Sequence, residues 1–239
     1  MNDDLDDPTV LVPVNVADPV EPPPALVELL HPHHVVVLGY YPVPDQASPE
    51  QFQAEYGEEA AAAVEDVSTS FADAGATVES VVVFTRDRRA TIDRIAEESD
   101  CHAVLTGGSI GERLDRVFVP LKGDVNLGRI VEFVGALLAE SDATVTLFNV
   151  ADSDDEEASG EFLLRGAADR LADDGITEDR IDWRQERSGS PGVAITAAAS
   201  EADLVVVGES EPSLREQLLG DVTERVIADS DRPVLVVRN

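Results

Sequence analysis

The sequence contains very few cysteine, lysine or aromatic residues. Cys101 is the single cysteine of the 239 residues, so the chain cannot form an internal disulfide. Aromatic residues make up 5% of the chain, so a core must be built mainly from Val, Leu, Ile and Ala. Lys122 is the single lysine, and every other basic residue is arginine.

Long apolar runs are also missing. No stretch approaches the roughly 20 apolar residues that a membrane-spanning helix requires. The chain begins with acidic residues, Asp3 and Asp4, where a signal peptide would carry basic ones. We therefore expect a cytoplasmic protein that is not inserted into a membrane.

What the chain has in excess is negative charge. It carries 49 Asp and Glu against 17 Lys and Arg, a formal net charge of -32. Such a field repels nucleic-acid phosphates and anionic membranes, so both are excluded as partners. The dispersed acid, with Arg in place of Lys, resembles the composition of haloarchaeal proteins. We expect stability to depend on salt, because the Debye length falls to roughly 3 Å at 1 M salt.

Strand-like apolar runs recur along the chain at an offset of about 100 residues, which indicates an internal duplication. The matching runs are 9–16 with 116–123, 34–41 with 143–150, 76–87 with 180–188, and 101–109 with 202–210. A fifth run, 232–239, has no counterpart in the first half. We therefore predict a truncated first domain, 1–115, with about four strands, and a complete second domain, 116–239, with five.

Helical segments separate these strands, so each domain is predicted to be a doubly wound, Rossmann-like α/β domain with a parallel sheet. Residues 58–75 and 161–175 are predicted helices that end at Gly75 and Gly175. The acidic segment 151–160 is predicted to be a solvated loop.

Four segments of the second half resemble the universal stress protein family. They are 116–123 (RVFVPLKG), 188–192 (SGSPG), 201–210 (EADLVVVGES) and, most specifically, 218–237 (LLGDVTERVIADSDRPVLVV). The resemblance implies a strand order 3-2-1-4-5 and a role in the stress response. Some members bind ATP at the carboxyl ends of the first and fourth strands, where the strand order reverses.

The resemblance also places a nucleotide-site motif on this chain. Its first and third glycines correspond to Gly208 and Gly220, followed by Asp221, Val222 and Thr223; Pro120 and Lys122 end the first strand. The pattern is incomplete, because Glu211 stands at the second glycine and Asp221 at the usual Ser or Thr. Lys122 is either an exposed turn residue or a cation for an anionic ligand, Asp124 or Asp221.

Asp221 begins the pattern Asp-Val-Thr-Glu, which is typical of a helix N-cap with a capping box. Its carboxylate would occupy the anion-favouring end of that helix. Like charges about 4 Å apart repel by several kcal/mol at an effective dielectric near 20. The sequence therefore predicts a degenerate nucleotide site without a bound cofactor.

The first half offers a different phosphate-like loop. Gly108 and Gly111 have the glycine-two-residues-glycine spacing, and Asn15 stands where the second half has Lys122. The rest of the motif is missing. This loop is the alternative site for ATP or AMP, and a tight turn is the competing interpretation.

Catalytic and metal-binding patterns are weak. His31, His33 and His34 could supply metal ligands, but the favoured interpretation is that they belong to a loop and the start of a strand. Cys101 and His102 are adjacent on a strand and point to opposite faces, so they cannot form a catalytic pair. The second half has no histidine to activate Ser188 or Ser190.

We therefore predict a non-enzymatic stress or regulatory protein with a degenerate nucleotide site. The alternative is an adenine-nucleotide-binding stress protein with weak or no hydrolysis. The expected assembly is a homodimer through the last strand of the second domain. The second half also resembles universal stress domains fused to transporters, so a transporter could be a partner in trans.

Overall fold

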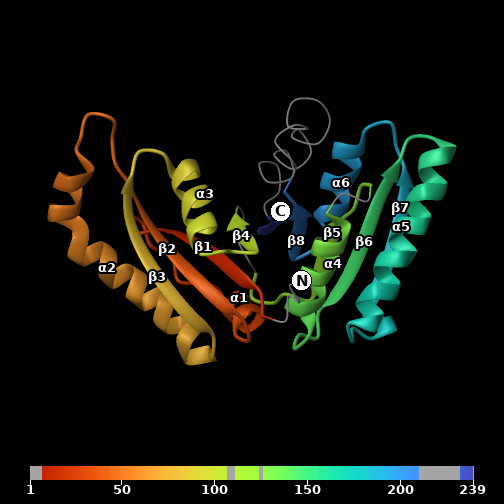
Figure 1. The fold of residues 1–239 in the computed structure, drawn as a ribbon, viewed down its shortest axis with the longest axis horizontal. Helices are drawn as coiled ribbons and strands as arrows, with labels where there is room; N and C mark the ends of the chain where they lie inside the picture. Colours follow the sequence, from red (N-terminus) through yellow and green to blue (C-terminus); the bar gives the residue numbers. More distant parts are fainter. Residues whose placement is uncertain (1–6, 107–110, 124–125, 210–231, 239) are drawn as a thin grey trace. The chain divides into compact units, whose positions relative to one another are not determined.

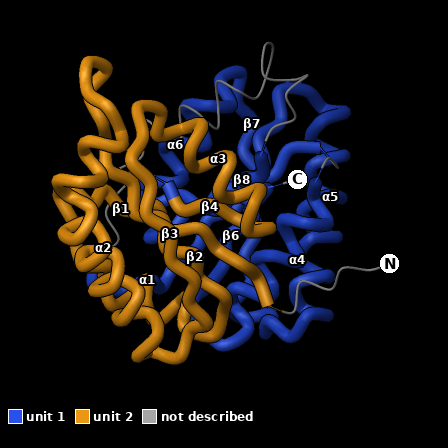
Figure 2. The backbone as a smooth tube through the Cα atoms, turned by 60° about the vertical axis from the view of Figure 1, so that its left-hand side comes forward, with its two compact units in different colours: residues 1–6, 106–239 blue, residues 7–105 orange. Residues whose placement is uncertain are grey.

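The structure is a computed structural model that describes residues 7–106, 111–123, 126–209 and 232–238. The chain divides into two compact units. We call residues 7–105 the N-terminal unit, orange in Figure 2, and residues 106–239 the C-terminal unit, blue in Figure 2.

The N-terminal unit is a four-stranded parallel sheet with the order β3-β2-β1-β4. Helices α1 and α2 cover one face and α3 the other (Figure 1). Its elements are β1 (Thr9–Asn15), α1 (Pro24–Leu30), β2 (His34–Pro42), α2 (Pro49–Ala74), β3 (Thr77–Thr85), α3 (Arg88–Glu98) and β4 (Ala103–Thr106).

The C-terminal unit is a five-stranded parallel sheet with the order β9-β8-β5-β6-β7. When the strands are numbered within the unit and read from β7 to β9, the order is 3-2-1-4-5, which confirms the predicted fold. Its elements are β5 (Arg116–Pro120), α4 (Leu127–Leu138), β6 (Thr144–Ala151), α5 (Asp154–Asp173), the 3-10 turn η1 (Glu178–Arg180), β7 (Ile181–Arg187), α6 (Pro191–Ala199), β8 (Leu204–Gly208) and β9 (Val234–Val237).

Aliphatic side chains of the strands make the core of each unit, as the low aromatic content requires. In the N-terminal unit, Leu11, Val36 and Leu38 pack against Ile95 of α3, and Cys101 is buried among them. In the C-terminal unit, buried residues of β5, β6, β8 and β9 pack against Ala194, Ala198 and Ala199 of α6. No described helix is both long and apolar enough to cross a membrane.

Helix α5 begins earlier than predicted, so the expected loop at 151–160 is wrong from Asp154 onward. The Ser153 hydroxyl accepts a hydrogen bond from the Glu156 N–H, and the Glu156 carboxylate accepts one from the Asp152 N–H. This is a capping-box arrangement. The acidic residues that suggested a solvated loop occupy the first turn of a helix, where its dipole favours negative charge.

Besides the missing fifth strand, the first helix differs between the two copies. Helix α1 has 7 residues and begins at a proline-rich segment, whereas α4 has 12. Helix α2 has 26 residues and begins at Pro49, before the predicted start at residue 58. It ends at Gly75, whose φ of 115° lies in the left-handed region that glycine adopts readily.

Candidate functional site

The strand order of the C-terminal unit reverses between β5 and β8. Strand β5 pairs in parallel with β6 on one side and with β8 on the other. In open α/β sheets, ligands bind outside the carboxyl ends of such a strand pair. The structure brings three of the predicted site residues to this edge: Pro120 ends β5, Lys122 follows it and Gly208 ends β8.

Gly208 has a packing role that the sequence did not reveal. A Cβ atom added there would lie 2.7 Å from Ile130 Cδ1 of α4, closer than side chains can approach. The neighbouring Glu209 N–H donates to the Val237 carbonyl at 2.7 Å. Glycine at this position therefore lets α4 pack closely on the end of β8, whether or not a ligand binds.

Asn126 joins the start of α4 to the end of β8. It precedes the helix with a φ of 59°, and its Nδ2 atom donates to the Glu209 carbonyl at 3.5 Å. Asn126 was not among the predicted site residues. Asparagine is one of the few residues that tolerate the left-handed region and cap helices, and that combination was the available signal.

Lys122 lies in an exposed turn between β5 and α4. Leu121, just before it, is anchored because its N–H donates to the Phe148 carbonyl at 2.7 Å, and Gly123 follows with a φ of 67°. Within the described residues, Lys122 forms no ion pair. Asp124 and Asp221, its two expected partners, lie outside the described residues.

A buried network of hydrogen-bonded side chains supports this turn. Asn149, only 6% exposed at the end of β6, donates from Nδ2 to the Leu121 carbonyl at 2.8 Å. Gln185 of β7 donates from Nε2 to Asn149 Oδ1 at 2.9 Å and to the Glu157 carbonyl at 3.0 Å. The network connects β5, β6, β7 and α5, and it holds the carboxyl end of β5 in place.

Gly160 of α5 leaves room for this network because glycine has no side chain. An added Cβ would lie 2.2 Å from Asn149 Oδ1 and 2.3 Å from Gln185 Nε2. This cluster was not predicted from the sequence, although a single asparagine near the end of an apolar strand was a signal for it.

The predicted phosphate-binding segment lies outside the described residues. This applies to Glu211, Gly220, Asp221, Val222 and Thr223, so the degenerate motif stays a prediction from the sequence. The described part of the same edge ends with the acidic residue Glu209.

In the N-terminal unit, Asn15 ends β1 as expected. Its Oδ1 atom accepts from the Ala17 N–H at 3.2 Å and its carbonyl accepts from the Asp18 N–H at 3.2 Å. Such an Asx turn shapes the chain after the strand. Gly108 lies outside the described residues. Gly111 is exposed, and an added Cβ would meet only the Arg113 carbonyl oxygen at 3.8 Å.

The remaining candidate side chains occupy separate places. His31 caps α1, His33 is buried and His34 begins β2. The described residues contain no group of three or more His, Cys, Asp or Glu that could hold a metal ion. His102 Nδ1 accepts a hydrogen bond from the Thr9 N–H at 2.9 Å. Ser190 caps α6, and its N–H donates to Ser188 Oγ.

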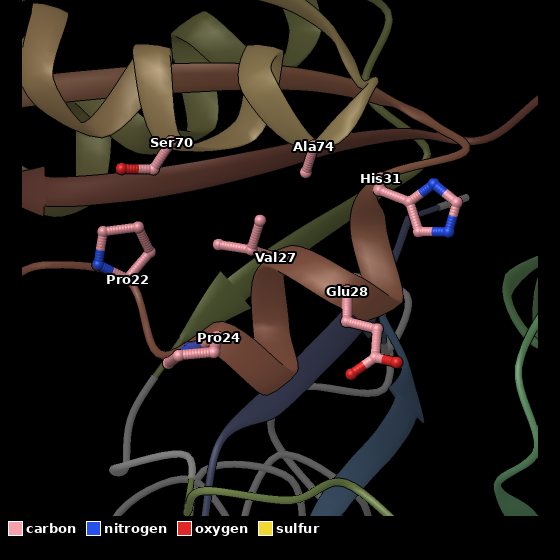
Figure 3. A pocket seen from close by; sticks show the side chains of 7 residues that line it. All are labelled: Pro22, Pro24, Val27, Glu28, His31, Ser70 and Ala74. Carbon is pink, nitrogen blue, oxygen red and sulfur yellow. The ribbon is translucent and has the colours of Figure 1, made fainter.

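A hollow of about 460 Å³ lies between α1 and α2 of the N-terminal unit. Figure 3 shows Val27 between the two helices, with Ser70 and Ala74 facing it from α2, while the His31 ring points away. Because α1 is short, this groove stays open. Its mostly apolar lining brings no catalytic groups together.

The fold and the site define the class of the protein. It is a doubly wound parallel α/β protein whose strand order reverses between β5 and β8, and the same unit is present twice, in shortened and complete form. The family model described as "Universal stress protein family" matches residues 113–238, just over half of the chain. The chain therefore belongs to the universal stress protein family.

Solved structures agree with this assignment at the level of the fold. A universal stress protein from Archaeoglobus fulgidus DSM 4304 is 19% identical, covers 97% of this chain and 96% of its own, and gives a TM-score of 0.68. A putative universal stress protein from Pseudomonas aeruginosa UCBPP-PA14 is 16% identical, covers 96% of this chain and 92% of its own, and gives a TM-score of 0.56.

A third structure is the cytoplasmic domain of a prokaryotic cation chloride cotransporter. It is 14% identical, covers 96% of this chain and 95% of its own, and gives a TM-score of 0.51. A search of curated proteins gave no significant match.

Proposed function

We propose that this protein is a non-enzymatic regulatory member of the universal stress protein family with a degenerate nucleotide site. The observation that carries the proposal is the contact of Asn126 with the Glu209 carbonyl at the switch point. It ties the start of α4 to the end of β8 through the chain's own groups. The close approach of Gly208 to Ile130 is consistent with this proposal, because it gives the glycine a packing reason that needs no phosphate.

Electrostatics also favour a site that rejects phosphate. Glu209 stands at the described end of β8, and the sequence adds Glu211 and Asp221 at motif positions where ATP-binding members carry Gly and Ser or Thr. Lys122 is the one lysine available to offset this charge. An incoming triphosphate would therefore meet several carboxylates.

The decisive experiment asks whether nucleotide is present and whether the motif can be restored. The protein is purified in molar KCl and denatured, and the supernatant is chromatographed for adenine nucleotides. We expect no nucleotide and no thermal shift with Mg-ATP. The double variant Glu211→Gly/Asp221→Ser, which removes two carboxylates, should gain a thermal shift. A near-stoichiometric nucleotide in the wild-type protein would contradict the proposal.

The alternative function is adenine-nucleotide binding with weak or no hydrolysis, with the loop Gly108–Gly111 as the site. Universal stress proteins have been solved with cAMP and with dAMP. Gly111, the one described residue of this loop, is exposed, which is compatible with this alternative. If nucleotide co-purifies, Gly108→Val should abolish it, whereas Gly208→Ala should not.

The assembly and the setting are part of the same proposal. The protein would act in the cytoplasm as a homodimer through β9 of the C-terminal unit, whose residues Val234–Val237 are all apolar. A transporter would be a partner in trans. A truncation before Arg232 should lower the mass of the assembly, and a truncated protein that stays folded and keeps the wild-type mass would contradict the contact through β9.

A further inference from the structure

The third strand of each unit lies at an edge of that unit's sheet, and the two edges differ in chemistry. Strand β3 is last in the order of the N-terminal unit, and β7 is last in that of the C-terminal unit. Exposed sheet edges present unpaired backbone groups that can pair with another strand. The duplication therefore allows a direct comparison of the same edge in two copies.

The hydrogen bonds show which backbone groups of β3 point outward. Thr77 N–H donates to the His33 carbonyl at 3.2 Å, and the Thr85 carbonyl accepts from the Val43 N–H at 2.8 Å. In a parallel pair, alternate residues bond to the same neighbour. The odd-numbered residues therefore pair with β2, and the even-numbered ones present their N–H and C=O groups to the outside. These outward residues are Val78, Ser80, Val82 and Phe84.

The same argument applies to β7. The Ser188 N–H donates to the Ala151 carbonyl at 3.0 Å, so the even-numbered residues face β6 and the odd-numbered ones face outward. The outward residues are Ile181, Trp183, Gln185 and Arg187. Aligning the outward residues in order makes Ser80 of β3 equivalent to Trp183 of β7.

The two edges are protected very differently. At the positions where β7 carries Asp182, Arg184 and Glu186, β3 carries Glu79, Val81 and Val83. Charged side chains on an edge strand are a common device against strand addition. Strand β3 has one charge in nine residues; Val81 and Val83 pack against the core of the N-terminal unit, and the outward residues Val82 and Phe84 are half-buried.

We propose that β3 is an interface at which a second copy of this chain adds its own β3 in antiparallel orientation about a two-fold axis at Val81. In this register Ser80 faces Val82 of the second copy, and Val78 faces Phe84. Every outward residue is then opposite another outward residue, which is the arrangement for paired hydrogen bonds in an antiparallel ladder. Glu79 faces Val83 of the second copy, so the only charge of the strand does not meet itself.

Neighbouring groups extend this surface and set its salt dependence. Phe84 stacks on Tyr41 with ring centroids 5.2 Å apart, and Tyr41 stacks on Tyr56 of α2 at 5.1 Å, so half-buried aromatic rings adjoin the edge. Helix α2 packs on β3 and carries exposed carboxylates, including Glu58 and Glu59. Two such helices near each other repel, and added salt screens that repulsion.

The experiment uses a proline at an outward amide. Ser80→Pro removes an N–H that makes no bond within the N-terminal unit, and Ser80 is exposed, so the strand can tolerate proline. Trp183→Pro removes the equivalent outward N–H of β7 and is the matched control. The mass of the assembly is measured by sedimentation equilibrium in molar KCl, with circular dichroism to confirm folding. We expect Ser80→Pro to lower the mass of the assembly, because it removes the β3 contact, and Trp183→Pro to leave the mass unchanged.

A second measurement does not depend on a variant. Hydrogen exchange of the wild-type amides should become slower with rising protein concentration at Val78, Ser80, Val82 and Phe84, while the odd-numbered amides of β3 change little.

Two results would overturn the interface. One is a wild-type protein that stays at the monomer mass of 25.5 kDa and shows no concentration-dependent protection. The other is an assembly whose mass Ser80→Pro leaves unchanged, because the contact through β9 would then account for the assembly alone.

Discussion

Asn149 donates a hydrogen bond to the carbonyl of Leu121 at 2.8 Å from a position that is almost completely buried. The bond joins the end of β6 to the turn that carries Lys122, at the edge where members of this fold class bind ligands. The turn is thus held by a buried polar network, and several tests can address that network directly.

Replacing Asn149 should destabilise the C-terminal unit. Asn149→Leu keeps a similar size but leaves the Leu121 carbonyl and Gln185 Nε2 without this partner, which should cost about 1–3 kcal/mol. Asn149→Asp should cost more at neutral pH, because it buries a carboxylate beside a carbonyl oxygen. Urea unfolding can be followed by the fluorescence of Trp183, the only tryptophan. A loss below about 0.5 kcal/mol for both variants would refute the network's role.

Two glycines of α5 should respond in opposite ways to the same substitution. Gly160→Ala places a methyl group 2.2 Å from Asn149 Oδ1 and should destabilise the unit. At exposed Gly166 an added Cβ meets nothing within 4 Å, so Gly166→Ala should stabilise the helix by roughly 0.5–1 kcal/mol. The same urea titration measures both. Equal effects at the two sites would show that the close contact at Gly160 relaxes without cost.

Gly208 can be tested for its packing role by a double-mutant cycle. Gly208→Ala should lower the free energy of unfolding, because its Cβ would approach Ile130 Cδ1 to 2.7 Å. Ile130→Val removes that atom and should cost about 0.5–1.5 kcal/mol alone. The double variant should be more stable than the sum of the single losses predicts. Simple additivity would mean that the glycine is needed for another reason, such as ligand approach.

Salt should raise the stability of the whole chain. The net charge of -32 makes the folded state repel itself, and molar salt reduces the Debye length to about 3 Å. We expect the midpoint of thermal unfolding, measured by circular dichroism, to rise from low salt to molar KCl. A midpoint that does not move between the two conditions would rule out this view of the acidic surface.

The sequence by itself determined the duplication and the parallel α/β class, and its resemblance to the universal stress protein family implied the strand order. Apolar strands alternating with helices leave few other arrangements, and the run 218–237 carried the family resemblance. The short α1 was also predictable, because Pro22, Pro23 and Pro24 limit where a helix can begin.

Tertiary structure decided the rest, because it depends on atoms that are distant in sequence. The contacts of Gly160 with Asn149 and of Gly208 with Ile130 join residues whose separation gives no local signal. Helix α5 could include the acidic run from Asp154 because the cap at Ser153 and the helix dipole outweigh the weak helix propensity of Asp. The outward backbone groups of β3 also follow only from its pairing with β2. Because β3 pairs on one side alone, its alternate residues keep unbonded N–H and C=O groups, whereas in a central strand every residue would be bonded.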